Sequence, residues 1–310
     1  MDKRRGRSLP DAMLLKPLAF NLEEALQVEN IYRPNLASVS SADYKPGGVT
    51  LSSRDGAVKN LRFLRIWLDL PHNVFFTAVS YLDMFLSRMK VQEKFLKCLT
   101  LSCLYLAADT ENSKINVDNL VKISQSKCTS RDVVRMAIIV KEKTKNPEGS
   151  KATTPSDFLK IYLEILKFFT NQWEHIISRD MFQIRENMLI LLEVLLSDSS
   201  TAYFRSSALA LIIFQMEVEK IMAKGLPNKS LYFLGEVLQF LSIVREIQLK
   251  CKIRNVELKN CYIQIAKVLK QYESEKNTKS HQKMTWNFSK STIQTCKRPG
   301  YYSNFQTIKE

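Results

Sequence analysis

The hydrophobic residues between positions 78 and 108 follow two consecutive helical patterns. The first pattern keeps one acidic residue, Asp83, inside an otherwise apolar stripe, and the second, at residues 93–108, is apolar on almost every side. Surface helices are apolar on one face only, and this segment is too short and too interrupted to span a membrane. The pattern therefore predicts a helix at the centre of a helical bundle, beside a helix that carries a half-buried carboxylate.

Further helical patterns on both sides complete a first set of helices. The patterns of this set cover residues 54–68, 74–86, 93–108, 117–124 and 130–143. Each places apolar residues three or four positions apart, which is the spacing of one helical face. The segment Asn146–Ser150 (NPEGS) ends the set, because proline and glycine interrupt helices.

A second set of helices follows this break. Residues Thr153–Asp157 (TTPSD) form a helix-start signal, with proline in the first turn. The patterns that follow cover residues 158–169, 184–196, 204–222, 231–248 and 256–272. Within them, Ser206–Phe214 (SSALALIIF) is again apolar on nearly every side. This segment repeats the role of residues 99–108, so a second bundle with its own buried middle helix is predicted.

The sequence thus predicts an all-α protein with two helical bundles of similar size. We assign residues 1–52 to an N-terminal segment and linker, within which residues 21–29 form a short helix. The first bundle spans residues 53–150 and the second spans residues 151–274. Residues 275–310 are polar and rich in lysine, as expected of a loosely attached basic tail.

The composition narrows the classes of function. Hydrophobic residues make up 45% of the 310 residues, and only 8 Gly and 9 Pro are present, which favours helices over many short strands. The formal net charge is +15, but Lys and Arg are interleaved with apolar residues on many helices. A basic surface in contact with water explains this better than a nucleic-acid groove, which needs clustered positive charge. No motif recurs at a short fixed period, which argues against a helical-repeat array.

The sequence offers no candidate catalytic, cofactor or metal site. The six cysteines form no CxxC pair and indicate buried thiols in a reducing compartment. The histidines His72, His175 and His281 are far apart and are expected to be surface or packing residues. Phosphate-binding GxxxxGK[ST], GxGxxG and zinc-binding HExxH motifs are absent from the sequence. We therefore expect a protein that is not an enzyme and that binds no cofactor, metal or small-molecule substrate.

Targeting features are weak. The N-terminus shows no apolar signal core, and no segment reaches the length of a membrane span, so no membrane association is expected. The basic start Met1–Arg7 (MDKRRGR) is a weak candidate for a nuclear import signal. These features together predict a protein of the nucleus and cytoplasm.

Several motifs, in one order and spacing, resemble the cyclin box. These are AVxxLDxFLSxMxV from Ala78, LSCxYLA from Leu101, ISQxxxTxxDxxRM from Ile123, KATT at residues 151–154, SxLAL from Ser207 and QKMTW at residues 282–286. The chain is identified as similar to the cyclin G and I subgroup, closest to cyclin G, over residues 54–303. This resemblance implies two five-helix repeats, of which the first grips a cyclin-dependent kinase and positions its regulatory helix.

The resemblance also implies one structural ion pair. Cyclins pair an arginine of their first helix with the aspartate of the LDxFL motif, and these positions correspond to Arg54 and Asp83 here. A half-buried aspartate without a cation would lose several kcal/mol, which favours this pairing over an exposed Arg54.

The positions that grip the kinase depart from the family pattern. The family's lysine at the end of its third helix corresponds to Asp109, and its glutamate after the RM dipeptide corresponds to Ala137. Neither replacement reproduces the original hydrogen bond, because aspartate cannot donate and alanine does neither. The apolar positions that dock substrate peptides are replaced too, by Ser53, Ala57 and Asn60. Thr144–Ser150 (TKNPEGS) likewise replaces an apolar seam.

These observations lead to one leading function and two alternatives. The leading expectation is a cyclin G-like regulatory subunit that binds a cyclin-dependent Ser/Thr kinase and activates it weakly or atypically. The resemblance also implies a protein phosphatase 2A regulatory subunit as a partner, so a kinase-independent adaptor that recruits this phosphatase is the first alternative. A cyclin-like transcription factor in contact with nucleic acid ranks lower.

Overall fold

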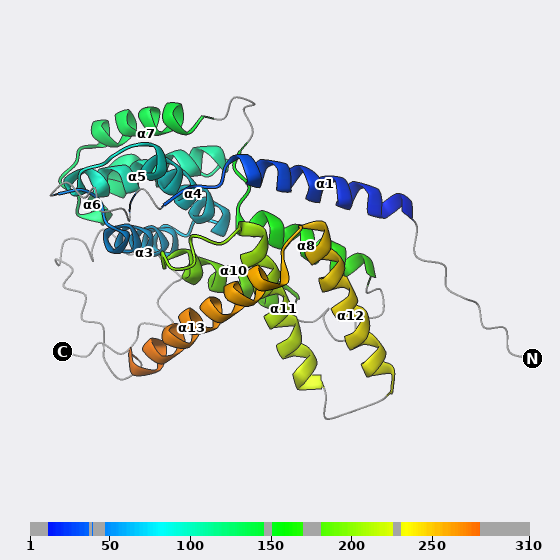
Figure 1. Cartoon of the computed structure of the whole chain (residues 1–310). Coiled ribbons are helices and arrows are strands. Elements are labelled where there is room, and N and C mark those ends of the chain that lie inside the picture. The colour runs from blue at the N-terminus through cyan, green and yellow to red at the C-terminus, as the bar shows by residue number, and fades with distance from the viewer. Residues whose placement is uncertain are drawn as a thin grey trace, which may run out of the picture. The chain divides into compact units, whose positions relative to one another are not determined.

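The computed structural model describes residues 12–36, 39, 47–145, 151–169, 181–225 and 231–279. Nearly all of these residues are helical, and their only β-structure is an isolated bridge between Gly48 and Gln92. The described helices are α1 (Ala12–Ile31), α3 (Leu51–Trp67), α4 (His72–Arg88), α5 (Glu93–Thr110), α6 (Val117–Ser124), α7 (Ser130–Thr144), α8 (Pro155–Phe169), α10 (Met181–Leu196), α11 (Ser206–Gly225), α12 (Leu231–Lys250) and α13 (Asn255–Lys279) (Figure 1). The predicted all-α class is confirmed.

Helices α3 to α7 form the first repeat, and α5 lies at its centre (Figure 1). Helix α5 packs against α3, α4 and α7. Its residues Leu99, Cys103 and Leu104 are at most 1% exposed. The hydroxyl of Ser102 donates to the carbonyl of Val133 on α7 at 2.9 Å, so a polar residue in the core is satisfied. The predicted buried central helix is confirmed.

Side-chain caps set the starts of three helices in this repeat. Thr50 and Ser53 form a reciprocal capping box at the start of α3, and Thr129 and Asp132 form another at the start of α7. Asn116 caps α6 through the backbone N–H of its third residue. Each cap satisfies an N–H group that the helix itself leaves unpaired. Because of its capping box, α3 begins three residues before the predicted start at Arg54.

The described residues 151–279 contain five helices, α8 and α10 to α13, and α11 is the central one. It packs against α8, α10 and α12. Every residue from Ala208 to Phe214 is at most 2% exposed, as predicted for this segment. Aromatic rings connect α11 to two of these helices, since Tyr162 of α8 and Phe240 of α12 both contact the ring of Phe214.

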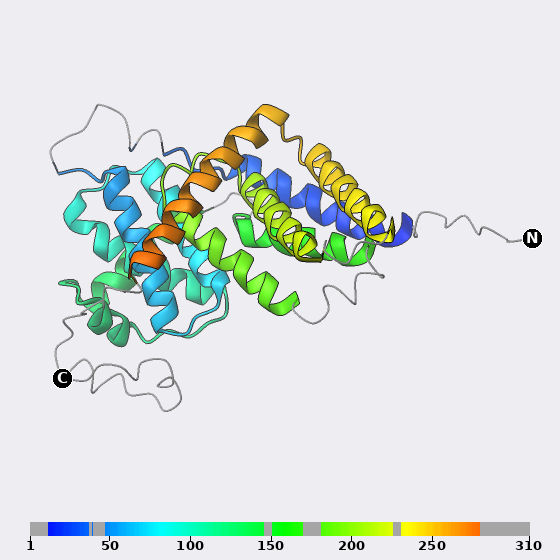
Figure 2. The ribbon, with the colours of Figure 1, turned by 90° about the horizontal axis from the view of Figure 1, so that it is seen from below.

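The N-terminal helix differs from its prediction. Instead of a short helix at residues 21–29, α1 extends over 20 residues and includes Pro17. It lies alongside α8 of the second repeat, as Figures 1 and 2 show. This packing contributes stability that the local sequence, with a proline past the first turn, does not indicate.

The chain divides into a compact unit of residues 1–270 and a second unit of residues 271–310. Helices α1 to α12 lie wholly in the first unit, and α13 crosses from the first to the second. Both predicted bundles therefore belong mainly to one compact unit. The predicted boundary at residue 150 and most of the predicted tail lie outside the described residues.

Candidate functional site

Arg54 and Asp83 form the ion pair that the resemblance implies. Arg54 Nε lies 2.9 Å from Asp83 Oδ1, and Arg54 Nη2 lies 2.6 Å from Asp83 Oδ2. This two-bond arrangement fixes both distance and orientation, and the side chains are 0% and 6% exposed. Burial lowers the pKa of Arg54, but the charges and hydrogen bonds of Asp83 and, after it, Asp55 together outweigh burial and raise this pKa overall. The pair joins α3 to α4 through the interior.

The same arginine makes a contact that the sequence did not predict. Arg54 Nη1 donates to the backbone carbonyl of Leu196 at 2.7 Å. Leu196 is the last residue of α10, where helix carbonyls lack an intrahelical partner and carry partial negative charge. A second carboxylate, that of Asp55, lies 3.2 Å from the same nitrogen. Arg54 therefore connects the first repeat to the second.

A second polar cluster between the repeats is centred on Glu193 of α10. This carboxylate is fully buried and accepts hydrogen bonds from Arg62 Nε at 3.2 Å and Arg65 Nη2 at 2.9 Å. His72 Nδ1 lies 2.7 Å from the other oxygen of Glu193, and His72 Nε2 lies 3.0 Å from Glu186. Burial raises the pKa of Glu193, but His72 and Arg65 together lower it below its ordinary value. His72 thus has a defined structural role between two carboxylates.

The sequence contains one sign of this cluster, a lone acidic residue in an apolar run, which the helix prediction did not use. Glu193 is a single acid within the apolar run LLEVLL, just as Asp83 is a single acid within an apolar stripe. A buried acid of this kind needs a cation. Its cations lie more than 100 residues earlier in the chain, so the sequence alone could not identify them.

The N-terminal helix is held to the second repeat by Glu29. Its carboxylate accepts hydrogen bonds from Arg205 Nε at 3.0 Å and Nη2 at 2.8 Å, and from the backbone N–H and hydroxyl of Ser207 at 2.7 and 2.8 Å. Ser207 lies in the first turn of α11, where a negative charge is favourable. Glu29 is only 5% exposed, so α1 is anchored by a buried charge.

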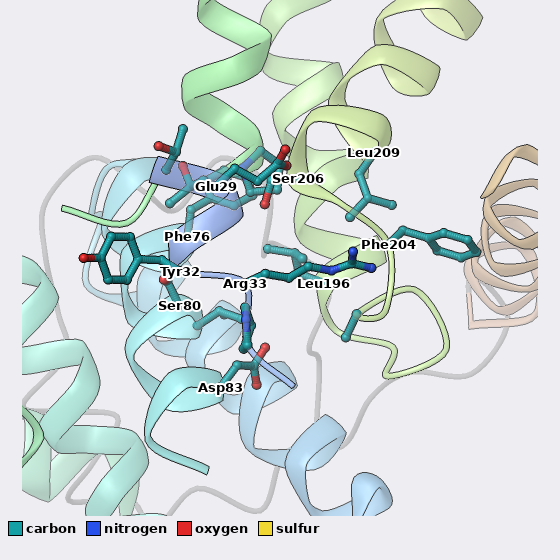
Figure 3. Close-up of a pocket in the computed structure, with 16 residues that line it drawn as sticks. Glu29, Tyr32, Arg33, Phe76, Ser80, Asp83, Leu196, Phe204, Ser206 and Leu209 are labelled. Carbon is teal, nitrogen blue, oxygen red and sulfur yellow. The ribbon is translucent and has the colours of Figure 1, made fainter. Parts of the chain in front are cut away.

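A small cavity lies where these contacts converge (Figure 3). It has a volume of about 60 Å³ and is lined by α1, α4, the segment before α8 and the turn before α11. Glu29 and Asp83 face it, and each already has a cationic partner. Ligand pockets usually exceed about 300 Å³. The space suits one or two water molecules, so it belongs to the junction between the repeats.

The two positions that the resemblance assigns to the kinase interface lie on helices that pack against each other. Asp109 is exposed near the end of α5, and Ala137 is on α7 and only 4% exposed. Around Ala137, the outer face of α7 presents three apolar side chains: Val134 is 37% exposed, Ile138 is 55% exposed and Ile139 is 42% exposed.

The three positions where the resemblance implies an apolar docking patch in related cyclins lie along α3. Ser53 belongs to the capping box, Ala57 is 6% exposed, and Asn60 faces solvent. Ser53 therefore has a local reason for its identity, because it completes the start of α3. No large apolar side chain stands at any of the three positions.

The described residues contain neither a membrane span nor a cluster of metal ligands. None of the described helices is long and apolar enough to cross a membrane. In the same part of the chain, no three His, Cys, Asp or Glu side chains gather as metal ligands would. His175, His281 and Cys296 lie outside the described residues.

Comparison with known proteins identifies the family. The profile described as the cyclin N-terminal domain matches residues 22–142. Cyclin-G1 of Rattus norvegicus is 30% identical over 302 residues, which cover 94% of this chain and 95% of that protein. The chain belongs to the cyclin G family. Cyclin G of Drosophila melanogaster is 27% identical over 275 residues, which cover 84% of this cyclin G family member but only 46% of the Drosophila protein.

The fold of this cyclin G family member also occurs in a solved structure. A viral cyclin from herpesvirus saimiri superposes with a TM-score of 0.54 at 15% identity, covering 81% of this chain and 99% of that chain. The expected cyclin fold and the resemblance to cyclin G are thereby confirmed. Membership of this family gives the chain a regulatory role of the cyclin type.

Proposed function

We propose that this member of the cyclin G family binds a cyclin-dependent Ser/Thr kinase through the outer faces of α5 and α7. It acts as a regulatory subunit and not as an enzyme, and it activates the kinase weakly or atypically. The observation that carries the proposal is the exposed apolar face of α7, formed by Val134, Ile138 and Ile139.

The position of this face favours a protein partner. Helix α7 buries its opposite side, with Val133 and Val140 fully buried in the first repeat. Three branched apolar residues therefore remain on one side of a helix that is already packed. Clustered exposed apolar side chains on a well-packed scaffold mark interaction sites more often than scattered ones do. Arg131 and Arg135 are exposed on the same side of α7, and Arg135 lies about one helical turn from Ile138 and Ile139, so the apolar side chains stand among basic ones.

The neighbouring charges favour a weak activator. Exposed Asp109 introduces negative charge where related cyclins carry a lysine, and Ala137 offers no acceptor where they carry a glutamate. Losing a charged hydrogen bond at an interface weakens binding, and opposite charge also repels the original partner group. The apolar face of α7 is then the main remaining source of affinity.

Binding to purified cyclin-dependent kinases, measured by calorimetry, tests the proposal. The change Ile138→Glu should abolish binding, because it introduces a charge into the apolar face. A matched control is Ile263→Glu on α13, where the isoleucine is 56% exposed, close to the 55% of Ile138. Equal affinity of both variants and the wild type, or no binding of the wild type to any such kinase, would contradict the proposal.

A second candidate function is an adaptor that recruits a protein phosphatase 2A regulatory subunit without a kinase. It is favoured by a separate exposed apolar surface on α12, where Leu238 is 62% exposed, Leu241 is 43% exposed and Leu249 is 53% exposed. The change Leu238→Glu should then abolish binding of the purified phosphatase subunit, whereas Ile138→Glu should leave it unchanged. The two candidate functions are thus separated by which variant loses which partner.

A further inference from the structure

A second cavity, larger than the one at the junction of the repeats, lies between α1 and α12. Its volume is about 550 Å³, and ligand pockets usually exceed about 300 Å³. One wall belongs to α1, and the other belongs to the end of α12 and the turn that follows it. Leu249, Lys250 and Lys252 of the second wall are exposed, so the cavity is open to solvent. We call it the α1–α12 cavity.

Hydrogen bonds through one arginine join the two walls. Arg205 donates to the carboxylate of Glu29 on α1 through Nε and Nη2. Its remaining nitrogen, Nη1, donates to the carbonyl of Cys251 in the turn after α12 at 3.0 Å. The walls are therefore held together in the absence of a ligand, and a preformed site lowers the entropic cost of binding.

The thiol of Cys251 supplies no reactive group to this cavity. Its Sγ lies 3.4 Å from the buried Tyr162 hydroxyl, and burial raises the pKa of the thiol to about 11, so it keeps its proton at neutral pH. Cys251 is buried, as the sequence led us to expect of the cysteines. That expectation is wrong for Cys98 and Cys128, which are partly exposed.

The turn after α12 holds a lysine in an unusual backbone conformation. Lys252 has a φ of 52°, which lies in the left-handed region that favours glycine. Its N–H donates to the carbonyl of Leu249 at 3.0 Å, and the N–H of Ile253 donates to the carbonyl of Gln248 at 3.1 Å. This pair of bonds is the Schellman end of a helix, where glycine is the usual residue. A lysine here costs stability, and backbone strain of this kind gathers at functional sites.

Lys250 and Lys252 make this end of the cavity positive. Both are exposed, and in the described part of the chain neither forms an ion pair. Arg205 also lines the cavity, but its charge is balanced by Glu29. The acid among the lining residues is Glu23, on the α1 wall. The two lysines therefore offer positive charge to a ligand.

The α1 wall adds hydrogen-bonding amides, and both walls add apolar surface. Gln27 and Asn30 line the cavity three positions apart on α1, and both are exposed. A carboxamide can donate and accept, so it can bind both the N–H and the carbonyl of a peptide backbone. Leu26 on α1 and Leu249 on α12 line the cavity with apolar side chains.

We propose that the α1–α12 cavity binds a short acidic peptide segment of a partner protein. Carboxylates of the segment pair with Lys250 and Lys252, and an apolar side chain of the segment packs against Leu26 and Leu249. Glu23 repels carboxylates from the α1 wall, so the acidic residues lie toward the lysines. A peptide fits these features better than a nucleic acid, because two unpaired lysines neutralise few phosphates and apolar side chains match none.

The test measures binding of a fluorescein-labelled acidic pentapeptide, EDLEE, to the full chain by fluorescence anisotropy. We expect saturable binding that weakens as salt is added, because salt screens exposed ion pairs. The peptide KKLKK, which has the opposite charge, should not bind.

A double variant of the two lysines tests the site itself. Lys250→Gln, Lys252→Gly should weaken binding of EDLEE by about tenfold or more, because two charged hydrogen bonds are lost. Its melting temperature should stay the same or rise, because glycine adopts the left-handed backbone without strain. The matched control Lys259→Gln, Lys267→Gln removes two exposed lysines of α13 outside the cavity and should leave the affinity unchanged.

Three results would overturn the proposal. The first is no saturable binding of EDLEE to the wild type, and the second is equal affinity of the cavity variant and the control variant. The third is equally strong binding of a single-stranded oligonucleotide, since any polyanion would then suffice. The inference does not depend on the proposed kinase binding, because the cavity variant leaves the face of α7 intact and should bind a kinase as the wild type does.

Discussion

At the scale of single residues, Arg54 shows how one buried cation can serve three helices. It lies on α3, forms two hydrogen bonds with Asp83 on α4 and donates to the last residue of α10. Arginine suits this position because its planar group offers several donors in fixed directions and stays charged when buried. A lysine would supply one ammonium in place of the fork and could not match all these acceptors.

The change Arg54→Ala should lower the free energy of unfolding by about 3 kcal/mol, because it leaves the Asp83 carboxylate buried without its cation. Chemical denaturation of the two proteins at neutral pH measures this difference. Arg131→Ala, which removes an exposed arginine of α7, is the matched control and should change stability little. A loss for Arg54→Ala that is no larger than that of the control would show that the pair contributes nothing.

At the scale of elements, buried carboxylates join helices that lie far apart in the sequence. Glu29 connects α1 to the first turn of α11, and Glu193 connects α10 to α3 and α4. Each carboxylate has several donors, which is the condition under which a buried charge is tolerated. The apolar faces of these helices pack together, and the buried carboxylates add specific contacts between particular pairs of helices.

Removal of the Glu29 carboxylate should release α1 from the second repeat. Glu29→Ala leaves Arg205 without its carboxylate partner and Ser207 without a cap, so we expect faster hydrogen exchange in residues 17–31 and a stability loss of about 3 kcal/mol. Glu24→Ala, on an exposed position of the same helix, is the control and should leave exchange unchanged. If the two variants exchange alike, α1 does not depend on this anchor.

Acid should weaken the cluster around Glu193. The pKa of Glu193 is lower in the folded chain than its ordinary value of 4.5, so the folded state binds the proton less well than the unfolded state. The contribution of this group is therefore complete above pH 4.5 and is lost as the pH falls through the folded pKa. In urea denaturation from pH 7 downward, the advantage of the wild type over Glu193→Gln should shrink below pH 4.5. An advantage that stays constant to low pH would contradict this assignment.

At the scale of the whole molecule, the two repeats form one scaffold with its candidate partner surfaces on opposite repeats. The hydrogen bonds and ion pairs of Arg54 and Glu193 lie between the repeats. They connect the two repeats without occupying the outer face of α7 or of α12. The scaffold of a cyclin is thus retained, while Asp109 and Ala137 alter the face that we assign to a kinase.

The double variant Asp109→Lys, Ala137→Glu should raise kinase activation, because it restores a donor and an acceptor beside the apolar face of α7. Phosphorylation of a standard substrate by a purified cyclin-dependent kinase measures the gain. Each single variant should give less than the pair, and thermal melting checks that the fold tolerates a glutamate in place of the almost buried alanine. Strong activation by the wild type, with nothing added by the variant, would show that these positions do not limit the protein.

The sequence by itself determined the helical class and both buried central helices, because local periodicity records which face of each helix avoids water. The Arg54–Asp83 pair came from the resemblance of the sequence to cyclins and not from periodicity. The sequence placed the short helix of residues 21–29 too narrowly, since packing on α8 extends α1 beyond its local preference. Only the tertiary structure decided that Arg54 reaches Leu196, that His72 lies between Glu186 and Glu193, and that Glu29 caps α11. Periodicity shows that a face is buried but not what covers it, because partners more than 100 residues away meet only when the helices pack.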